Sequence, residues 1–180
     1  MIDIDSLLAE TAEAPPCGPD LAYDAAFIEL EQLARGKAEE QIGATVREAE
    51  PPPWPVVQKL ASALLGRSKD VRAATLLVRS LVHTEGFAGL APGLAFMHGL
   101  LDRYWDAVHP LLDADDGNDP TMRLNALAPL ADPLGLVKEL RDTPLVRSRQ
   151  LGAVLVRDVE IALGKLPVRT GVAAMPQAQV

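Results

Sequence analysis

The sequence predicts an all-α fold, a single helical-bundle-like domain of about 5–7 helices. Three observations support this prediction. Leu, Ala and Val supply most of the 48% hydrophobic residues, while aromatic residues make up only 4%, and Leu and Ala favour helices. Apolar residues recur at helical spacing in several segments. Prolines and glycines separate these segments, and a chain of 180 residues suits one domain.

The first predicted element is a short amphipathic turn at residues 4–8, which ends at the sequence APPCGPD because its prolines and glycine favour a turn. A helix over residues 23–35 follows, with Gly36 as its C-cap. Residues 37–50 are charged and weakly patterned, so we expect a surface loop there. The segment PPPWP cannot lie inside a helix, and a second helix is predicted from its tryptophan onward, over residues 54–65.

The two longest helices are predicted in the middle of the chain. The third helix covers residues 71–85, after N-cap candidates at residues 68–70. The fourth, over residues 90–108, has the clearest helical period, and Pro92 must lie in its first turn or kink it. Because Pro110 follows, this helix is expected to end just before that residue.

Shorter elements are expected in the last third of the chain. Helical spacing is found over residues 124–130, 134–140 and 156–163. Residues 144–156 fit a short extended segment. The final residues, 167–180, have no period and are predicted to be a linker or disordered tail. The helical domain is therefore assigned to residues 1–166.

Charge and cysteine usage narrow the classes of function. The formal net charge is -8 and no basic run is present, which argues against binding to nucleic acid or to an anionic membrane. Cys17 is the only cysteine, so no intrachain disulfide can form, and this composition is compatible with a reducing compartment. The N-terminus does not read as a secretory signal, and no apolar stretch approaches the length of about 18 residues that a membrane span needs. We therefore expect a cytoplasmic protein.

The stretch HPLLDADDGNDPTMR, residues 109–123, has the highest density of polar side chains in the chain. Three hypotheses fit it: a calcium loop, a catalytic acid cluster and a well-ordered turn. An EF-hand loop that starts at Asp113 would need a ligand at position 5, a glycine at position 6 and a glutamate at position 12. The chain has Gly117, Asn118 and Leu124 at these positions, so the EF-hand pattern fails. A hydrolase needs two carboxyl groups held apart in a cleft, which one exposed turn does not favour.

The turn hypothesis explains more of these residues. Asp119 before Pro120 is a suitable N-cap for a following helix, and Asp116 lies near the positive end of that helix dipole. The intervening Gly-Asn pair consists of residue types that accept positive φ. We expect Arg123, one turn into the helix, to reach back toward these aspartates and to order the turn.

The histidines and the cysteine give no catalytic motif. None of His83, His98 and His109 has a HExxH partner or a cysteine at metal spacing, and Cys17 lies in a Pro/Gly turn without a neighbouring histidine. His83 and His109 lie near predicted helix C-termini, so capping is their expected role. We predict no enzyme activity, no metal and no cofactor. A metal-binding or hydrolytic enzyme that uses the Asp-rich turn is the alternative.

Three aromatic residues have two interpretations each. Tyr104 and Trp105 are adjacent near the end of the fourth predicted helix, where neighbouring positions point about 100° apart, so one ring is expected in the core and the other at its edge. Trp54 follows three prolines. Core packing is the default, but a half-buried ring is also typical of an interface anchor. A generic helical peptide-binding adaptor is therefore a further alternative.

Several longer phrases in the chain resemble one known family. They are PCGPDLAYD at residues 16–24, SKDVRAATLL at 68–77, EGFAGLAPGL at 85–94 and LLDRYWDAVHPLLDADDGNDPTMRLNALAPL at 100–130. With these phrases in this order, most of the chain resembles the N-terminal domain of the TssA/ImpA family of type VI secretion proteins.

The resemblance implies a non-enzymatic, cytoplasmic assembly protein of Gram-negative bacteria that acts at the baseplate and in tail tube and sheath assembly. It implies baseplate, membrane-complex, tube and sheath subunits as partners, with no nucleic acid and no membrane insertion. The family's C-terminal oligomerisation domain is expected to be absent from this chain, so we expect a monomer or weak dimer. The signature residues that are also candidate interface residues are Trp54, Tyr104, Trp105, His109, Asp116, Asp119 and Arg123.

Overall fold

The computed structural model describes residues 2–42, 45–150 and 152–167. In this part of the chain the elements are α1 (Ile4–Leu8), α2 (Ala25–Arg35), β1 (Glu40–Ile42), β2 (Thr45–Arg47), α3 (Trp54–Arg67), α4 (Val71–Glu85), α5 (Phe87–Tyr104), η1 (Ala114–Asp116), α6 (Thr121–Leu127), η2 (Ala128–Leu130), α7 (Leu136–Arg141), β3 (Pro144–Ser148), β4 (Gly152–Leu155) and α8 (Val156–Ala162). Within these ranges, none of the helices combines the length and the apolar content that a bilayer crossing requires. The tail expected over residues 167–180 lies, from residue 168 onward, outside the described residues.

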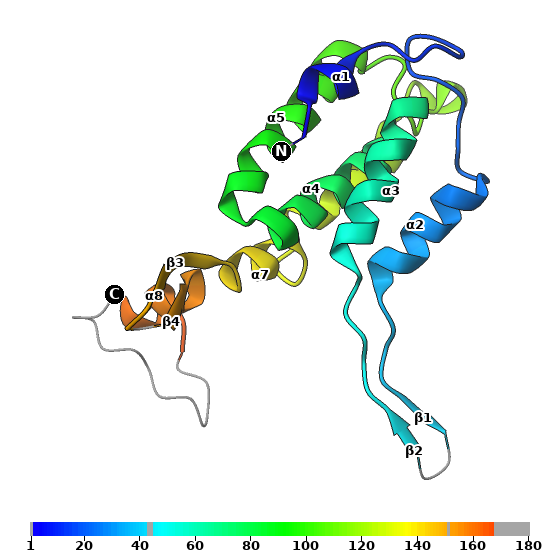
Figure 1. The fold of residues 1–180 in the computed structure, drawn as a ribbon. Coiled ribbons are helices and arrows are strands. Elements are labelled where there is room, and N and C mark those ends of the chain that lie inside the picture. Colours follow the sequence, from blue (N-terminus) through cyan, green and yellow to red (C-terminus); the bar gives the residue numbers. More distant parts are fainter. Residues whose placement is uncertain (1, 43–44, 151, 168–180) are drawn as a thin grey trace.

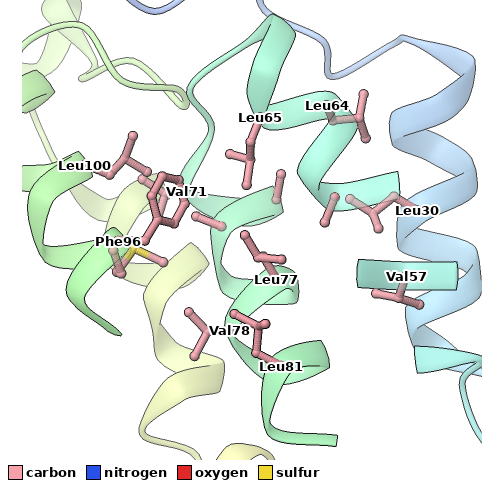
Figure 2. Packing of buried hydrophobic residues seen from close by; sticks show 14 of the residues in the cluster. Leu30, Val57, Leu64, Leu65, Val71, Leu77, Val78, Leu81, Phe96 and Leu100 are labelled. Atoms are coloured by element: carbon pink, nitrogen blue, oxygen red, sulfur yellow. The ribbon is translucent and has the colours of Figure 1, made fainter. Parts of the chain in front are cut away.

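Helix α4 is the central helix of the fold and lies between α3 and α5 (Figure 1). Asp70 caps its N-terminus, because the Asp70 carboxylate accepts a hydrogen bond from the Arg72 N–H at 2.7 Å, and Gly86 ends it with a φ of 64°. Both ends therefore confirm the prediction. Figure 2 shows the apolar side chains that meet around α4. Fully buried members from α2, α3, α4 and α5 include Leu30, Val57, Leu77, Val78, Leu81 and Phe96.

Helix α5 approaches α4 closely because it presents glycines there. A Cβ atom on Gly89 would lie 2.5 Å from the carbonyl oxygen of Leu81, and a Cβ atom on Gly93 would lie 3.2 Å from the Cδ1 atom of the same leucine. Pro92 lies in the second turn of α5, since the helix begins earlier than predicted. The backbone contact under 3.0 Å leaves no room for a larger residue at Gly89, and the side chain of Leu81 would have to shift to admit one at Gly93, so both glycines permit the close approach of the helices.

Helices predominate, as predicted, but two antiparallel ribbons show that the fold is not purely all-α. Strands β1 and β2 pair where a surface loop was predicted, with Glu40 opposite Arg47. Figure 1 shows that this ribbon stands away from the helices. Its strands are short and partly polar, so they lack the apolar alternation that predicts a strand. Strands β3 and β4 confirm the extended segment predicted over residues 144–156, and α8 confirms the short helix after it.

A largely buried ion pair joins helix α7 to helix α4. The Glu139 carboxylate accepts hydrogen bonds from the Arg79 Nε at 3.2 Å and lies 3.4 Å from the Nε2 atom of His83. The His83 ring stacks on Trp54 with ring centres 4.2 Å apart, and the Arg79 guanidinium lies 5.2 Å from the centre of the Trp54 ring. Trp54 is buried, so this tryptophan belongs to the core rather than to an exposed site.

Replacing Glu139 with glutamine is expected to lower the free energy of unfolding by about 2–3 kcal/mol near neutral pH. Burial raises the pKa of Glu139, but hydrogen bonds from His83 and Arg79 and the nearby charges outweigh burial and lower it from 4.5 to about 2. The folded-state pKa therefore lies below the unfolded one, so the carboxylate stabilises the fold above about pH 4.5 and this contribution disappears as the pH falls toward 2. Urea unfolding followed by circular dichroism over this pH range measures both effects.

The exposed ion pair between Lys37 and Glu50 supplies the matched control for that prediction. Its two side chains are 64% and 57% exposed, so Glu50→Gln is expected to change stability by less than about 0.5 kcal/mol. If Glu139→Gln keeps the acid sensitivity of the original chain, another carboxylate is responsible for it.

Candidate functional site

The acidic segment is an ordered turn that is held by its own backbone. The N–H groups of Asp113 and Asp119 each donate a hydrogen bond to the other residue's carbonyl oxygen at 3.2 Å. The Asp113 carboxylate accepts a hydrogen bond from the Asp115 N–H at 3.0 Å. Gly117 and Asn118 have φ values of 62° and 63°, which confirms the prediction of positive φ for this pair.

The aspartates of this turn cap backbone groups. Asp119 accepts a hydrogen bond from the N–H of Thr121, the first residue of α6, at 3.2 Å, which is close to the predicted N-cap role. Asp115 and Asp116 are exposed to solvent. Across residues 2–42, 45–150 and 152–167, no three His, Cys, Asp or Glu side chains are grouped so that they could hold a metal ion. The described residues therefore offer the metal hypothesis no cluster of ligands.

Arg123 is fully buried and donates to backbone carbonyls, so the prediction that it reaches the aspartates is wrong. Its Nε donates to the carbonyl oxygen of Pro110 at 2.7 Å, its Nη2 to that of Val108 at 2.8 Å, and its Nη1 to that of Trp105. The guanidinium carbon also lies 4.9 Å from the centre of the Trp105 ring. A planar group with five N–H donors can bind several carbonyls at once, so Arg123 fixes the path of the chain after α5. Helix α5 accordingly ends at Tyr104, before the predicted end.

The segment after α5 that Arg123 binds meets two other parts of the chain in a buried polar junction. These are the N-terminal loop at Cys17 and Gly18 and the residues just before α4. The Nε2 atom of His109 lies 3.0 Å from the Gly18 carbonyl oxygen, and its backbone N–H donates to the Lys69 carbonyl at 3.0 Å. The Lys69 N–H in turn donates to the Cys17 carbonyl at 2.6 Å. His109 lies beyond the end of α5, so it is a junction residue and the prediction that it caps a helix is wrong.

Two ionisable side chains of the junction are buried as well. The Lys69 ammonium donates to the Leu65 carbonyl oxygen at 3.0 Å, and burial lowers the pKa of Lys69. Burial likewise raises the pKa of the Cys17 thiol. Both shifts favour the neutral forms in a site shielded from water. In the sequence, Lys69 belonged only to the N-cap candidates at residues 68–70, and nothing there indicated that its side chain is buried.

Of the two adjacent aromatic residues, Tyr104 packs against the core and Trp105 lies at the surface. The Tyr104 hydroxyl donates to the Leu8 carbonyl oxygen at 2.6 Å, which anchors α1 to the end of α5. Trp105 is 39% exposed, so the expectation of one inner and one outer ring is confirmed. The structure brings Trp105, His109 and Arg123 together at the acidic turn, whereas Trp54 lies at the opposite end of α3, beside His83.

Exposed apolar side chains lie on both sides of the acidic turn in the chain, and nothing in the sequence marked them as exposed. Besides Trp105, they are Leu111, Met122 and Leu124, each more than half exposed. Leu111 directly follows Pro110, whose carbonyl oxygen accepts a hydrogen bond from Arg123. Met122 and Leu124 are the residues on either side of Arg123 in α6. We call these four residues, together with Asp113, Asp115, Asp116 and Asp119, the acidic-turn surface. It combines apolar area with an acidic rim on a backbone that one buried arginine holds in place.

A family model described as "ImpA, N-terminal, type VI secretion system" matches residues 8–132. The chain belongs to the ImpA N-terminal family. Over 165 residues, 91% of this chain, it is 53% identical to a Pseudomonas aeruginosa protein named type VI secretion system component TssA1, and it spans about half (47%) of that protein's length.

A solved structure also resembles this member of the ImpA N-terminal family. It is the N-terminal domain, with the conserved ImpA_N region, of the TssA component of the type VI secretion system from Burkholderia cenocepacia. The TM-score is 0.69 at 31% identity, and the match covers 91% of this chain and 59% of that one. The region matched by the ImpA family model contains the whole acidic-turn surface and the buried junction, while β3, β4 and α8 lie beyond it.

Proposed function

We propose that this chain is a non-enzymatic assembly module of a type VI secretion apparatus, which binds other subunits through the acidic-turn surface. The observation that carries the proposal is the set of exposed apolar side chains fixed around a buried arginine. Trp105 and Met122 have the residue types found at interface centres, and an exposed acidic rim suits a partner with basic residues.

The relatives support the same conclusion, since the Pseudomonas aeruginosa and Burkholderia cenocepacia proteins are both named as type VI secretion components. The partners that we propose are subunits of the baseplate, membrane complex, tube or sheath. The proposed location is the cytoplasm, and residues 1–166 form the proposed ImpA-type domain, which is monomeric or weakly dimeric. The acidic-turn surface presents exposed apolar side chains beside exposed carboxylates, a composition that suits a protein interface.

Replacing Met122 with glutamate is expected to weaken binding to a partner subunit at least about tenfold, because a charge replaces an apolar side chain in the middle of the interface. Met122 is 61% exposed, so stability is expected to change by less than about 0.5 kcal/mol. Pull-downs with each purified subunit of the same secretion system identify the partner, and calorimetric titration then measures the affinity.

Leu134→Glu is the matched control, because Leu134 is 82% exposed and lies outside the acidic-turn surface. It adds the same charge and is expected to leave binding within about twofold of the original chain. Equal losses in both variants would show that net charge, rather than this surface, governs binding.

A further inference from the structure

Helix α5 has a second, largely apolar face that is mostly exposed, in addition to the face that packs on α4. Its buried face consists of Gly89, Gly93, Phe96, Met97 and Leu100. The opposite face, which we call the α5 stripe, consists of Phe87, Ala91, Leu94, His98, Leu101 and Trp105. Leu101 is half-buried and the other five are exposed. Figure 1 shows α5 at the outer edge of the helical layer, with α4 on its inner side.

The spacing along the α5 stripe is that of a helix-docking seam. Successive members are 4, 3, 4, 3 and 4 residues apart, and an alternation of 3 and 4 is the apolar repeat through which one helix packs on another. A helix with apolar residues on both faces is normally covered on both. The stripe continues to Trp105, so it is contiguous with the acidic-turn surface.

Charge distinguishes the two ends of the α5 stripe. Its C-terminal end carries exposed Asp102 and Asp106, and the acidic turn adds Asp115 and Asp116 nearby, against Arg103 alone. At the N-terminal end, the first turn of α5 has no acidic residue, and Glu85, just before it, is half-buried and accepts a hydrogen bond from Gln58. An occupant that matches this pattern has apolar residues along one face and positive charge at one end.

Charge argues against a second copy of this chain as the occupant. In a pair of identical chains, the exposed Asp102 and Asp106 at the acidic end of each α5 stripe would gain no basic partner.

We propose that the α5 stripe binds an amphipathic helix of a partner protein, whose apolar seam covers Phe87 to Trp105 and whose basic end lies at Asp102 and Asp106. This inference deepens the proposed function and rests on it, because the helix would belong to a partner subunit. It names the secondary structure and the charge of the segment that the partner contributes.

The test uses a fluorescently labelled synthetic helix of about 20 residues, with leucines at alternating spacings of 3 and 4 and lysines clustered at one end. A companion peptide has glutamates in place of the lysines. Fluorescence anisotropy with the full chain is expected to show binding of the lysine peptide, at least about tenfold weaker binding of the glutamate peptide, and loss of affinity with added salt.

Leu94→Glu and Ile28→Glu are a matched pair of variants for this experiment. Leu94 is 43% exposed on the α5 stripe, and Ile28 is 42% exposed on α2, so both variants add one charge at equally exposed helical sites. Leu94→Glu is expected to weaken binding of the lysine peptide at least about tenfold, and Ile28→Glu by less than about twofold. Absence of peptide binding, or equal effects of the two variants, would overturn the proposal.

Measurements of self-association and of subunit binding distinguish failure of the stripe proposal from failure of the proposed function. If sedimentation shows that the chain forms a dimer at micromolar concentration that Leu94→Glu abolishes, a second copy covers the stripe and the proposal is wrong. If a subunit is found whose binding Met122→Glu weakens and Leu94→Glu does not, the stripe proposal fails while the proposed function stands. If the peptide binds but none of the subunits does, the proposed function fails instead.

Discussion

Replacing Arg123 with methionine is expected to lower the free energy of unfolding by about 3–5 kcal/mol. Arg123 is fully buried, and its guanidinium donates to three backbone carbonyls, of Trp105, Val108 and Pro110. Each buried carbonyl left without a donor costs about 1–3 kcal/mol, while release of a buried cation offsets part of the sum. Methionine keeps most of the apolar part of the arginine side chain, so the loss of stability measures the contribution of the guanidinium group. Denaturant unfolding measures the difference.

Two further variants show whether the shape of the guanidinium or only its charge matters. Arg123→Lys keeps the charge, but one ammonium cannot match the planar fork that binds three carbonyls, so this variant is expected to lose almost as much stability as Arg123→Met. Arg103→Met removes an exposed arginine from the last turn of α5 and is expected to cost less than about 0.5 kcal/mol. A lysine variant as stable as the original chain would mean that charge alone is sufficient.

Features with a local cause were predicted from the sequence. Helix α4 was placed correctly because Asp70 and Gly86 mark its two ends and its apolar positions repeat between them. The positive φ values of Gly117 and Asn118 follow from their residue types. In both cases the deciding interactions lie within a few residues of one another, so the sequence contains them.

Features with a distant cause were not predictable. The aspartates lie a few residues from Arg123 in the sequence, which suggested an ion pair, but the carbonyl oxygens that it binds belong to residues 13, 15 and 18 positions earlier. The junction of His109 with Gly18 spans 91 positions. The exposed residues of the acidic-turn surface have the same types as core residues, and only the packing of the chain decides which of them remain outside.

Replacing Gly18 with alanine is expected to lower the free energy of unfolding by about 3–4 kcal/mol. Gly18 has a φ of 79°, which an L side chain rarely adopts, and a Cβ atom on it would lie 2.1 Å from the carbonyl oxygen of Arg67 and 3.1 Å from the Cα atom of Ser68. The backbone conformation accounts for about 1 kcal/mol. The rest follows because the loop that contains Gly18 must move away from the end of α3.

Gly117→Ala separates these two contributions. Gly117 has a φ of 62°, but nothing lies within 4 Å of the position that a Cβ atom would take, so only the conformational cost of about 1 kcal/mol is expected. The difference between the two variants therefore measures the close approach of the N-terminal loop to Arg67.

Movement of the loop would also stretch the contact between the His109 Nε2 and the Gly18 carbonyl oxygen. Gly18→Ala and His109→Ala should therefore cost less stability together than the sum of their separate effects. Equal losses for Gly18→Ala and Gly117→Ala would mean that the loop can withdraw freely and that the junction does not depend on this contact.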